Sequence, residues 1–131
     1  MAEQRPSIDQ WILDAQADAS AKDCGMYLTH MGVVRESPKQ LVRKGIDDGT
    51  RVVGMYFSYD AQKVDAAIES CKQMEGINYV RVWLNSGELV VGDPIMQVLI
   101  GGDIRPHVID ALQTLVGTIK NECVVEQEQR G

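Results

Sequence analysis

The segment 79–100 (YVRVWLNSGELVVGDPIMQVLI) most constrains the fold of this chain, because β-branched and apolar residues lie on both sides of a Ser86-Gly87-Glu88 turn signal. This pattern predicts two strands joined at that turn. The residues that follow, 103–120, have apolar residues at helical spacing, and Pro106 is tolerated in the first turn of such a helix. A hairpin followed by an amphipathic helix predicts a sheet with a helix packed on it.

The rest of the sequence extends this layered pattern. Ser7 and Gln10 form a capping-box signature that predicts a helix over 8–18. Strands are expected over 26–34 and 51–59, and Asp60 is a good N-cap for a helix that stops near Gly76. The resulting order predicts an α+β fold, a two-layer sandwich of a mostly antiparallel sheet with packed helices.

Two segments lack any periodic pattern. Residues 36–50 are interrupted by Pro38, Gly45 and Gly49 and are rich in Lys and Arg, so we expect a mobile basic loop. Residues 122–131 are polar and acidic, and we expect a frayed tail there.

The composition limits the possible functions. A length of 131 residues is enough for one compact domain, 1–131, with a real core. The formal net charge of −6 argues against a nucleic-acid binder held by phosphate contacts. There is no apolar run long enough for a membrane span and no signal-peptide pattern. The three widely spaced cysteines are typical of reduced thiols, so we expect a cytoplasmic protein that does not bind a membrane.

Three cationic residues are candidates for a binding site: Arg35, Arg105 and Lys120. Arg105 lies in the first helical turn, where anions are favoured, so it either points into solvent or helps the free N–H groups bind an anion. Fifteen positions separate it from Lys120, roughly 22 Å along a helix axis, which is too far for one small substrate to touch both. If both serve one site, a second subunit must supply one of them, which predicts a homodimer. His30 and His107 lie far apart without ligand spacing, and no metal site is expected.

These residues lie in motifs that resemble the large, catalytic subunit of molybdopterin synthase. Residues 24–35, which end in Gly32-Val33-Val34-Arg35, resemble the family's F-x-G-x-V-R pattern, and 53–59 resemble its L-x-Y-E-x-Y strand. Residues 87–93 (GELVVGD) resemble G-x-L-x-V-G-(D/E), and the final helix ends in Lys120 as the family's does. The resemblance covers about 7–128.

The resemblance implies an α/β-hammerhead-like fold and a homodimer that binds a small β-grasp sulfur carrier with a C-terminal Gly-Gly thiocarboxylate. Two sulfurs would pass to cyclic pyranopterin monophosphate to give molybdopterin, a step of molybdenum cofactor biosynthesis, with no separate cofactor. Arg35 matches the family's substrate-binding Arg, and Arg105 matches the Arg of a His-Arg pair at the helix start. Lys120 matches the first of two active-site lysines.

The resemblance also has departures in the active site. Ile104 replaces the His of the helix-start pair, and Leu84-Asn85 replaces a second His-Arg pair. In the C-terminal motif Gln127 stands where the second lysine belongs, while Glu126 and Glu128 bring repulsive charge near any bound anion. Losing one preorganised cation at such a site typically costs ~10²–10³ in rate.

Three functions therefore remain open. The first is an active synthase subunit, a sulfurtransferase with an altered site. The second is a catalytically silent relative that still binds a β-grasp sulfur carrier. The third is a small-molecule regulatory domain on a similar sandwich.

Overall fold

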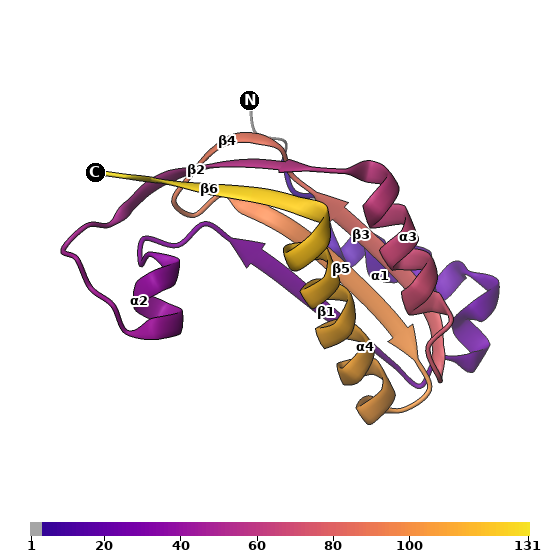
Figure 1. Cartoon of the computed structure of the whole chain (residues 1–131). Helices are drawn as coiled ribbons and strands as arrows, with labels where there is room; N and C mark the ends of the chain where they lie inside the picture. The colour runs from indigo at the N-terminus through magenta and orange to yellow at the C-terminus, as the bar shows by residue number, and fades with distance from the viewer. Residues whose placement is uncertain (1–3) are drawn as a thin grey trace.

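The computed structural model describes residues 4–131, which form two antiparallel sheets with helices packed around them (Figure 1). The α-helices are α1 (Ile8–Ala17), α2 (Lys39–Lys44), α3 (Ala61–Lys72) and α4 (Arg105–Thr118). A 3₁₀ turn, η1 (Ala19–Asp23), follows α1, and a π-helical turn, η2 (Ile119–Cys123), follows α4. The strands are β1 (Met26–Val33), β2 (Val52–Tyr59), β3 (Ile77–Leu84), β4 (Gly87–Val90), β5 (Pro94–Gly102) and β6 (Val124–Arg130). The α+β class predicted from the sequence is confirmed.

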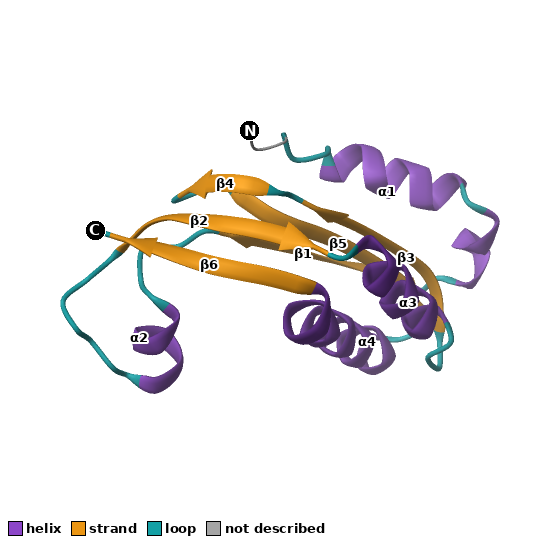
Figure 2. Ribbon diagram, turned by 45° about the horizontal axis from the view of Figure 1, so that its top comes forward, coloured by secondary structure: helices purple, strands orange, loops and turns teal. Residues whose placement is uncertain are grey.

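The first sheet has the order β1-β5-β3 and is covered on both faces. Figure 2 shows α1 on one side of this sheet and α3 and α4 on the other. Leu99 of β5 packs against Trp11 and Ala15 of α1, whereas Ile100 belongs to the main core together with Leu115 of α4. This double cover explains why β5 is an almost continuous apolar run.

The second sheet has the order β4-β2-β6 and buries mainly one face. Phe57 and Met55 of β2 point into the main core with Leu89 of β4. Tyr56 of β2 and Val125 of β6 are instead exposed. Alternating burial of this kind is typical of antiparallel strands with one solvated face.

The predicted helix starts are confirmed by their caps. The Ser7 hydroxyl accepts the Gln10 N–H at 3.1 Å, which fixes the first turn of α1. The Asp60 carboxylate accepts the N–H groups of Gln62 and Lys63 at 3.0 and 3.2 Å at the start of α3.

The predicted hairpin turn at Ser86-Gly87-Glu88 is wrong. Residues 87–90 are strand β4, which leaves the first sheet to pair with β2, so 79–100 contributes to three strands rather than two. Pairing of β3 with β5 ends at Leu84 opposite Met96, and the chain reverses at 91–93, where Gly92 has φ 93°. A left-handed conformation of this kind is accessible to glycine without steric cost.

The prediction of a frayed tail is also wrong, because 124–130 form β6 along β2. The sequence does not indicate this strand, because two of the three residues on its inward face are the carboxylates Glu126 and Glu128. In the basic loop 36–50, the structure contains the short helix α2, which ends at Gly45 with φ 69°. Mobility of this loop remains a prediction.

Candidate functional site

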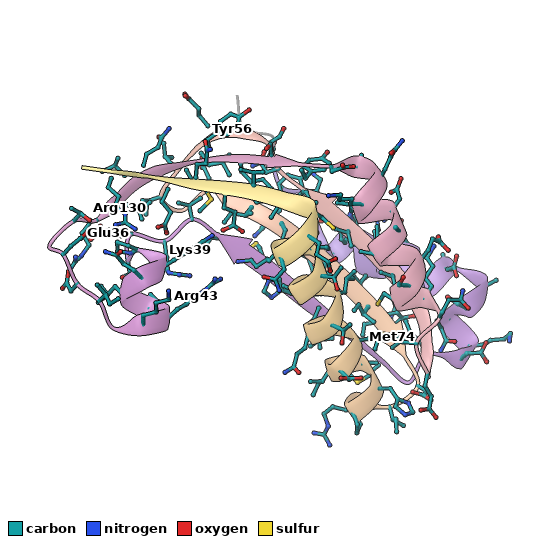
Figure 3. The ribbon with its side chains drawn as sticks, viewed as in Figure 1. Glu36, Lys39, Arg43, Tyr56, Met74 and Arg130 are labelled. Atoms are coloured by element: carbon teal, nitrogen blue, oxygen red, sulfur yellow. The ribbon has the colours of Figure 1, made fainter. Side chains whose placement is uncertain are left out.

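A cluster of four cationic side chains surrounds a narrow cavity where the end of β1, α2, η2 and β6 meet. We call Arg35, Lys39, Arg43 and Lys120 the cation cluster. The lining is completed by Glu126, Glu128, Val33, Met55 and Ile95. Figure 3 shows Lys39 and Arg43 reaching from α2 toward β1. The cavity measures about 20 Å³, room for about one water molecule.

Arg35 enters the cluster because it directly follows β1. The end of this strand is fixed by the Val34 N–H, which donates to the Asp93 carbonyl at 3.0 Å. The Arg35 Nε donates to the Ser37 carbonyl at 3.1 Å, and the residue is exposed. The guanidinium therefore lies at the solvent side of the cavity and can meet an incoming anion.

Lys120 enters the cluster from the π-helical turn η2. Ile119 before it and Cys123 after it are buried in the main core and anchor the turn. The Lys120 side chain is 31% exposed. A π-turn at the end of a helix is often found at functional sites, because it redirects side chains from the regular helical positions.

Glu126 is the buried carboxylate of the cavity, with a side chain that is only 5% exposed. Its Oε2 lies 2.7 Å from the Lys39 Nζ, and its Oε1 lies 3.7 Å from the Lys120 Nζ. Among the described residues, no donor lies within hydrogen-bond distance of Oε1. One carboxylate therefore lies beside two ammonium groups, makes a close ion pair with Lys39 only, and leaves the pair of lysines with excess positive charge.

Glu128 connects the same strand to the backbone of α2. Its carboxylate accepts the Lys39 N–H at 3.1 Å and lies 3.2 Å from an Arg130 guanidinium nitrogen. Arg130 also pairs with Asp48 at 3.3 Å. Hydrogen bonds from Thr50 lower the pKa of Asp48 to about 2, so this carboxylate stays charged. The basic segment is thus attached to β6 at the start of α2 and again at Asp48, beyond the end of that helix.

His30 lies on β1, near Lys120, and is half-buried. Burial lowers the pKa of His30, and the positive charge of Lys120 lowers it further. Within residues 4–131, its buried Nε2 has no hydrogen-bond partner. The sequence had suggested no role for this residue, and the structure places it near the candidate lysine.

Arg105 and Ile104 lie at the other end of α4 from Lys120. Both are exposed, and Arg105 makes no ion pair with the described part of the chain. Asp103 precedes this end: its carboxylate accepts the Ile104 N–H and lies 2.8 Å from the His107 Nδ1. That hydrogen bond raises the pKa of His107. The two ends of α4 are therefore separate places within one chain.

Gln127 lies on the exposed face of β6, opposite Tyr56 of β2. Glu126 and Glu128 point the other way, toward the cation cluster. In a single chain, Gln127 is therefore not part of the cavity that Lys120 lines.

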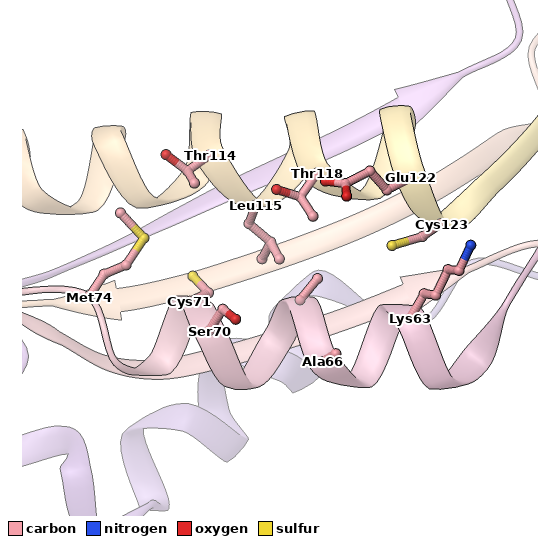
Figure 4. Close-up of a pocket in the computed structure, with 11 residues that line it drawn as sticks. Lys63, Ala66, Ser70, Cys71, Met74, Thr114, Leu115, Thr118, Glu122 and Cys123 are labelled. Atoms are coloured by element: carbon pink, nitrogen blue, oxygen red, sulfur yellow. The ribbon is translucent and has the colours of Figure 1, made fainter.

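A larger groove lies between α3 and α4, with a volume of about 580 Å³ (Figure 4). None of the predicted site residues lines it. Burial raises the pKa of its Cys71 thiol to about 11, so this thiol is protonated at neutral pH. Cys24, Cys71 and Cys123 are all free thiols.

Sequence reasoning selected Arg35 and Lys120, which the fold brings together, but missed Lys39 and Arg43. Both lie on α2, inside the segment expected to be a loop. The composition of 35–51, which is rich in Lys and Arg, did indicate a basic segment. Only the contacts with β6 show that Lys39 points toward Glu126.

Two further features concern metals and membranes. In the part of the chain that the structure describes, no three His, Cys, Asp or Glu side chains gather in a way that could hold a metal ion. None of the helices within 4–131 has the length and apolar character needed to cross a bilayer.

Comparison with known structures shows the same fold in proteins of molybdopterin biosynthesis. Molybdopterin synthase from Staphylococcus aureus matches with a TM-score of 0.74 at 13% identity, over 98% of this chain and 88% of that chain. The molybdopterin biosynthesis MoaE protein from Burkholderia ambifaria MC40-6 matches with a TM-score of 0.71 at 14% identity, over 96% and 81%. A complex of subunits 1 and 2 of the molybdopterin-converting factor from Helicobacter pylori 26695 matches with a TM-score of 0.62 at 16% identity, over 95% and 82%.

Sequence comparison adds the family. No curated protein matches the chain. The model of the family described as MoaE protein matches residues 2–122, nearly the whole chain. The chain therefore belongs to the MoaE protein family, as its sequence motifs had indicated.

Proposed function

We propose that this chain is the large subunit of a molybdopterin synthase in the cytoplasm and acts in molybdenum cofactor biosynthesis. It would bind a small β-grasp sulfur carrier and transfer sulfur from the carrier's C-terminal thiocarboxylate to cyclic pyranopterin monophosphate. The observation that carries this proposal is the meeting of Arg35 and Lys120 at one cavity in a chain of the MoaE family. The subunit complex from Helicobacter pylori among the similar structures supports a small-subunit partner.

The chemistry of the cation cluster suits this reaction. The substrate carries a phosphate, and negative charge develops as the thiocarboxylate passes on its sulfur. Arg35 lies at the open side of the cavity, where it can bind phosphate with paired N–H groups. Lys120 is partly buried, where its charge is screened less and stabilises a developing anion more effectively.

We also propose that the working unit is a homodimer. Arg105 lies at the far end of α4 from Lys120, so both can serve one site only if a second copy brings its own α4 start to the cluster. Ile104 and Gln127 would then contribute to the site through the neighbouring copy rather than from the same chain.

A silent, carrier-binding relative is the second candidate. The contact of Glu126 with both Lys39 and Lys120 favours it, because these cations already hold an anion. The presence of Gln127 on the other face of β6 also favours it, since no second lysine stands there.

Reconstitution separates the two functions. The chain would be mixed with a thiocarboxylated β-grasp carrier and cyclic pyranopterin monophosphate, and molybdopterin would be measured against a carrier-only background. We expect product, and an approximately 10²–10³-fold lower rate for Lys120→Ala with unchanged carrier affinity. The matched control is Lys63→Ala, which removes an exposed lysine of α3 outside the cation cluster. Carrier binding without product would establish the silent relative, and neither binding nor product would refute both.

A further inference from the structure

The contact between Glu126 and the two lysines leaves one buried carboxylate oxygen without a hydrogen bond among the described residues. A carboxylate that is 95% buried normally has all its oxygens hydrogen-bonded, since an unsatisfied buried charge is costly. Glu126 has a close bond through Oε2 to Lys39, while its Oε1 lies 3.7 Å from Lys120 and has no hydrogen bond within the described chain. Lys120 is thus held near a carboxylate without being fully paired.

We infer that Glu126 is an internal counter-anion that occupies the anion subsite formed by Lys39 and Lys120, and that an anionic ligand must displace it to bind. The ligand class, a carboxylate or a phosphate, rests on the proposed function. The occupation of the subsite by Glu126 rests only on the contacts of this chain.

The size of the cavity supports competition rather than simultaneous binding. The enclosed space beside Glu126 holds about one water molecule, so a carboxylate or phosphate group does not fit inside the cavity while Glu126 keeps its position. The two anions would also repel each other at close range in a partly buried site.

The position of Glu126 makes displacement feasible. It lies on β6, the outer strand of the sheet β4-β2-β6, and its Lys39 partner lies on the short helix α2. Lys39 and Lys120 are each about one-third exposed, so both ammonium groups can be reached from solvent. A ligand that engages these groups would release Glu126 from the cluster and loosen the side-chain contact of β6 with α2.

The test uses anion binding, which does not depend on any sulfur-transfer activity. Two probes distinguish the ligand sources: inorganic phosphate, and a short peptide ending in Gly-Gly with a free carboxylate. Their affinities would be measured by NMR titration for the full chain and for Glu126→Gln, which removes the charge and keeps the side-chain size. We expect Glu126→Gln to bind at least one probe about tenfold more tightly than the unchanged chain.

The matched control is Glu122→Gln. Glu122 lies in η2, two positions from Lys120, but it lines the α3–α4 groove and not the cation cluster. Glu122→Gln removes the same formal charge as Glu126→Gln, so we expect it to change the affinity by less than about twofold. Adding Lys120→Gln to Glu126→Gln should abolish the gain, which a purely structural role of Glu126 would not predict.

Equal gains in Glu122→Gln and Glu126→Gln would overturn the inference, because they would reflect net charge alone. Unchanged affinity in a folded Glu126→Gln variant would overturn it as well. If that variant does not fold, Glu126→Asp keeps the charge but shortens the side chain, so it cannot span both lysines. We then expect about threefold tighter binding, and unchanged binding would refute the inference. If only the proposed function is wrong, the reconstitution would give no molybdopterin, while Glu126→Gln would still bind phosphate more tightly than the unchanged chain.

Discussion

The central strand of the first sheet and the edge strand of the second differ sharply in burial. Eight of the nine residues of β5 are buried, whereas none of the seven residues of β6 is fully buried. Helices cover both faces of the first sheet, but the inward face of β6 meets a charged cavity. The comparison shows that the first sheet is buried on both faces, whereas the edge strand of the second sheet supplies the candidate site, although β2 and β4 of that sheet also pack on the core.

The largest expected effect follows from truncating a side chain of the buried strand β5. Ile100→Ala on β5 removes a fully buried side chain from the main core and should lower the free energy of unfolding by about 2–5 kcal/mol. Val125→Ala on β6 is the matched control, since its side chain is 51% exposed, and should change it by less than about 0.5 kcal/mol. Urea denaturation measures both, and similar losses would contradict the difference in burial between β5 and β6.

A smaller effect is expected at the contact between β6 and α2. Glu128→Gln weakens the bond to the Lys39 N–H and the ion pair with Arg130, and should cost about 1 kcal/mol. Amide hydrogen exchange in 39–44 should become faster, while exchange in β5 should not change. Glu88→Gln, an exposed carboxylate on β4, is the control. Unaltered exchange in 39–44 would mean that Glu128 does not hold α2 in place.

The smallest effect concerns the exposed start of α4, which covers the first sheet. The Asp103 hydrogen bond raises the pKa of His107, so protonation of His107 stabilises the folded chain. This contribution is fully present below the ordinary pKa of 6.5 and is lost as pH rises through the higher folded pKa. The pKa of Asp103 is lowered by the same bond, so its contribution is lost as pH falls below 3.8.

Chemical denaturation at several pH values tests this prediction. The difference in free energy of unfolding between the unchanged chain and His107→Gln should be largest between pH 3.8 and pH 6.5 and should decrease toward alkaline pH. A difference that stays constant with pH, or grows above neutrality, would show that His107 does not stabilise through its charge.

The sequence predicted well the helices in which apolar residues recur at a regular spacing. The helix caps at Ser7 and Asp60 are local interactions, and they appear in the structure as expected. The apolar stripe of α4 packs on the core, because a helix with one apolar face has few alternatives.

The missed elements depend on contacts between distant segments. The strand β4 is short and pairs with β2, about thirty positions earlier, so no local pattern distinguishes it from a turn. On the inward side of β6, Glu126 faces Lys39 and Lys120 rather than apolar residues, so the sequence of this strand resembles a polar tail. The sequence therefore identified Arg35 and Lys120 but not the α2 lysine beside them.

The most direct test of the central claim is whether the cation cluster receives the end of a carrier protein. Calorimetric titration would compare an intact β-grasp carrier with one that lacks its two terminal glycines. We expect at least about tenfold weaker binding for the shortened carrier, and a smaller loss on truncation when Arg35 is replaced by Ala. Equal affinity of the two carriers would contradict the account, because the cluster around Arg35 and Lys120 would then not receive the carrier's C-terminus.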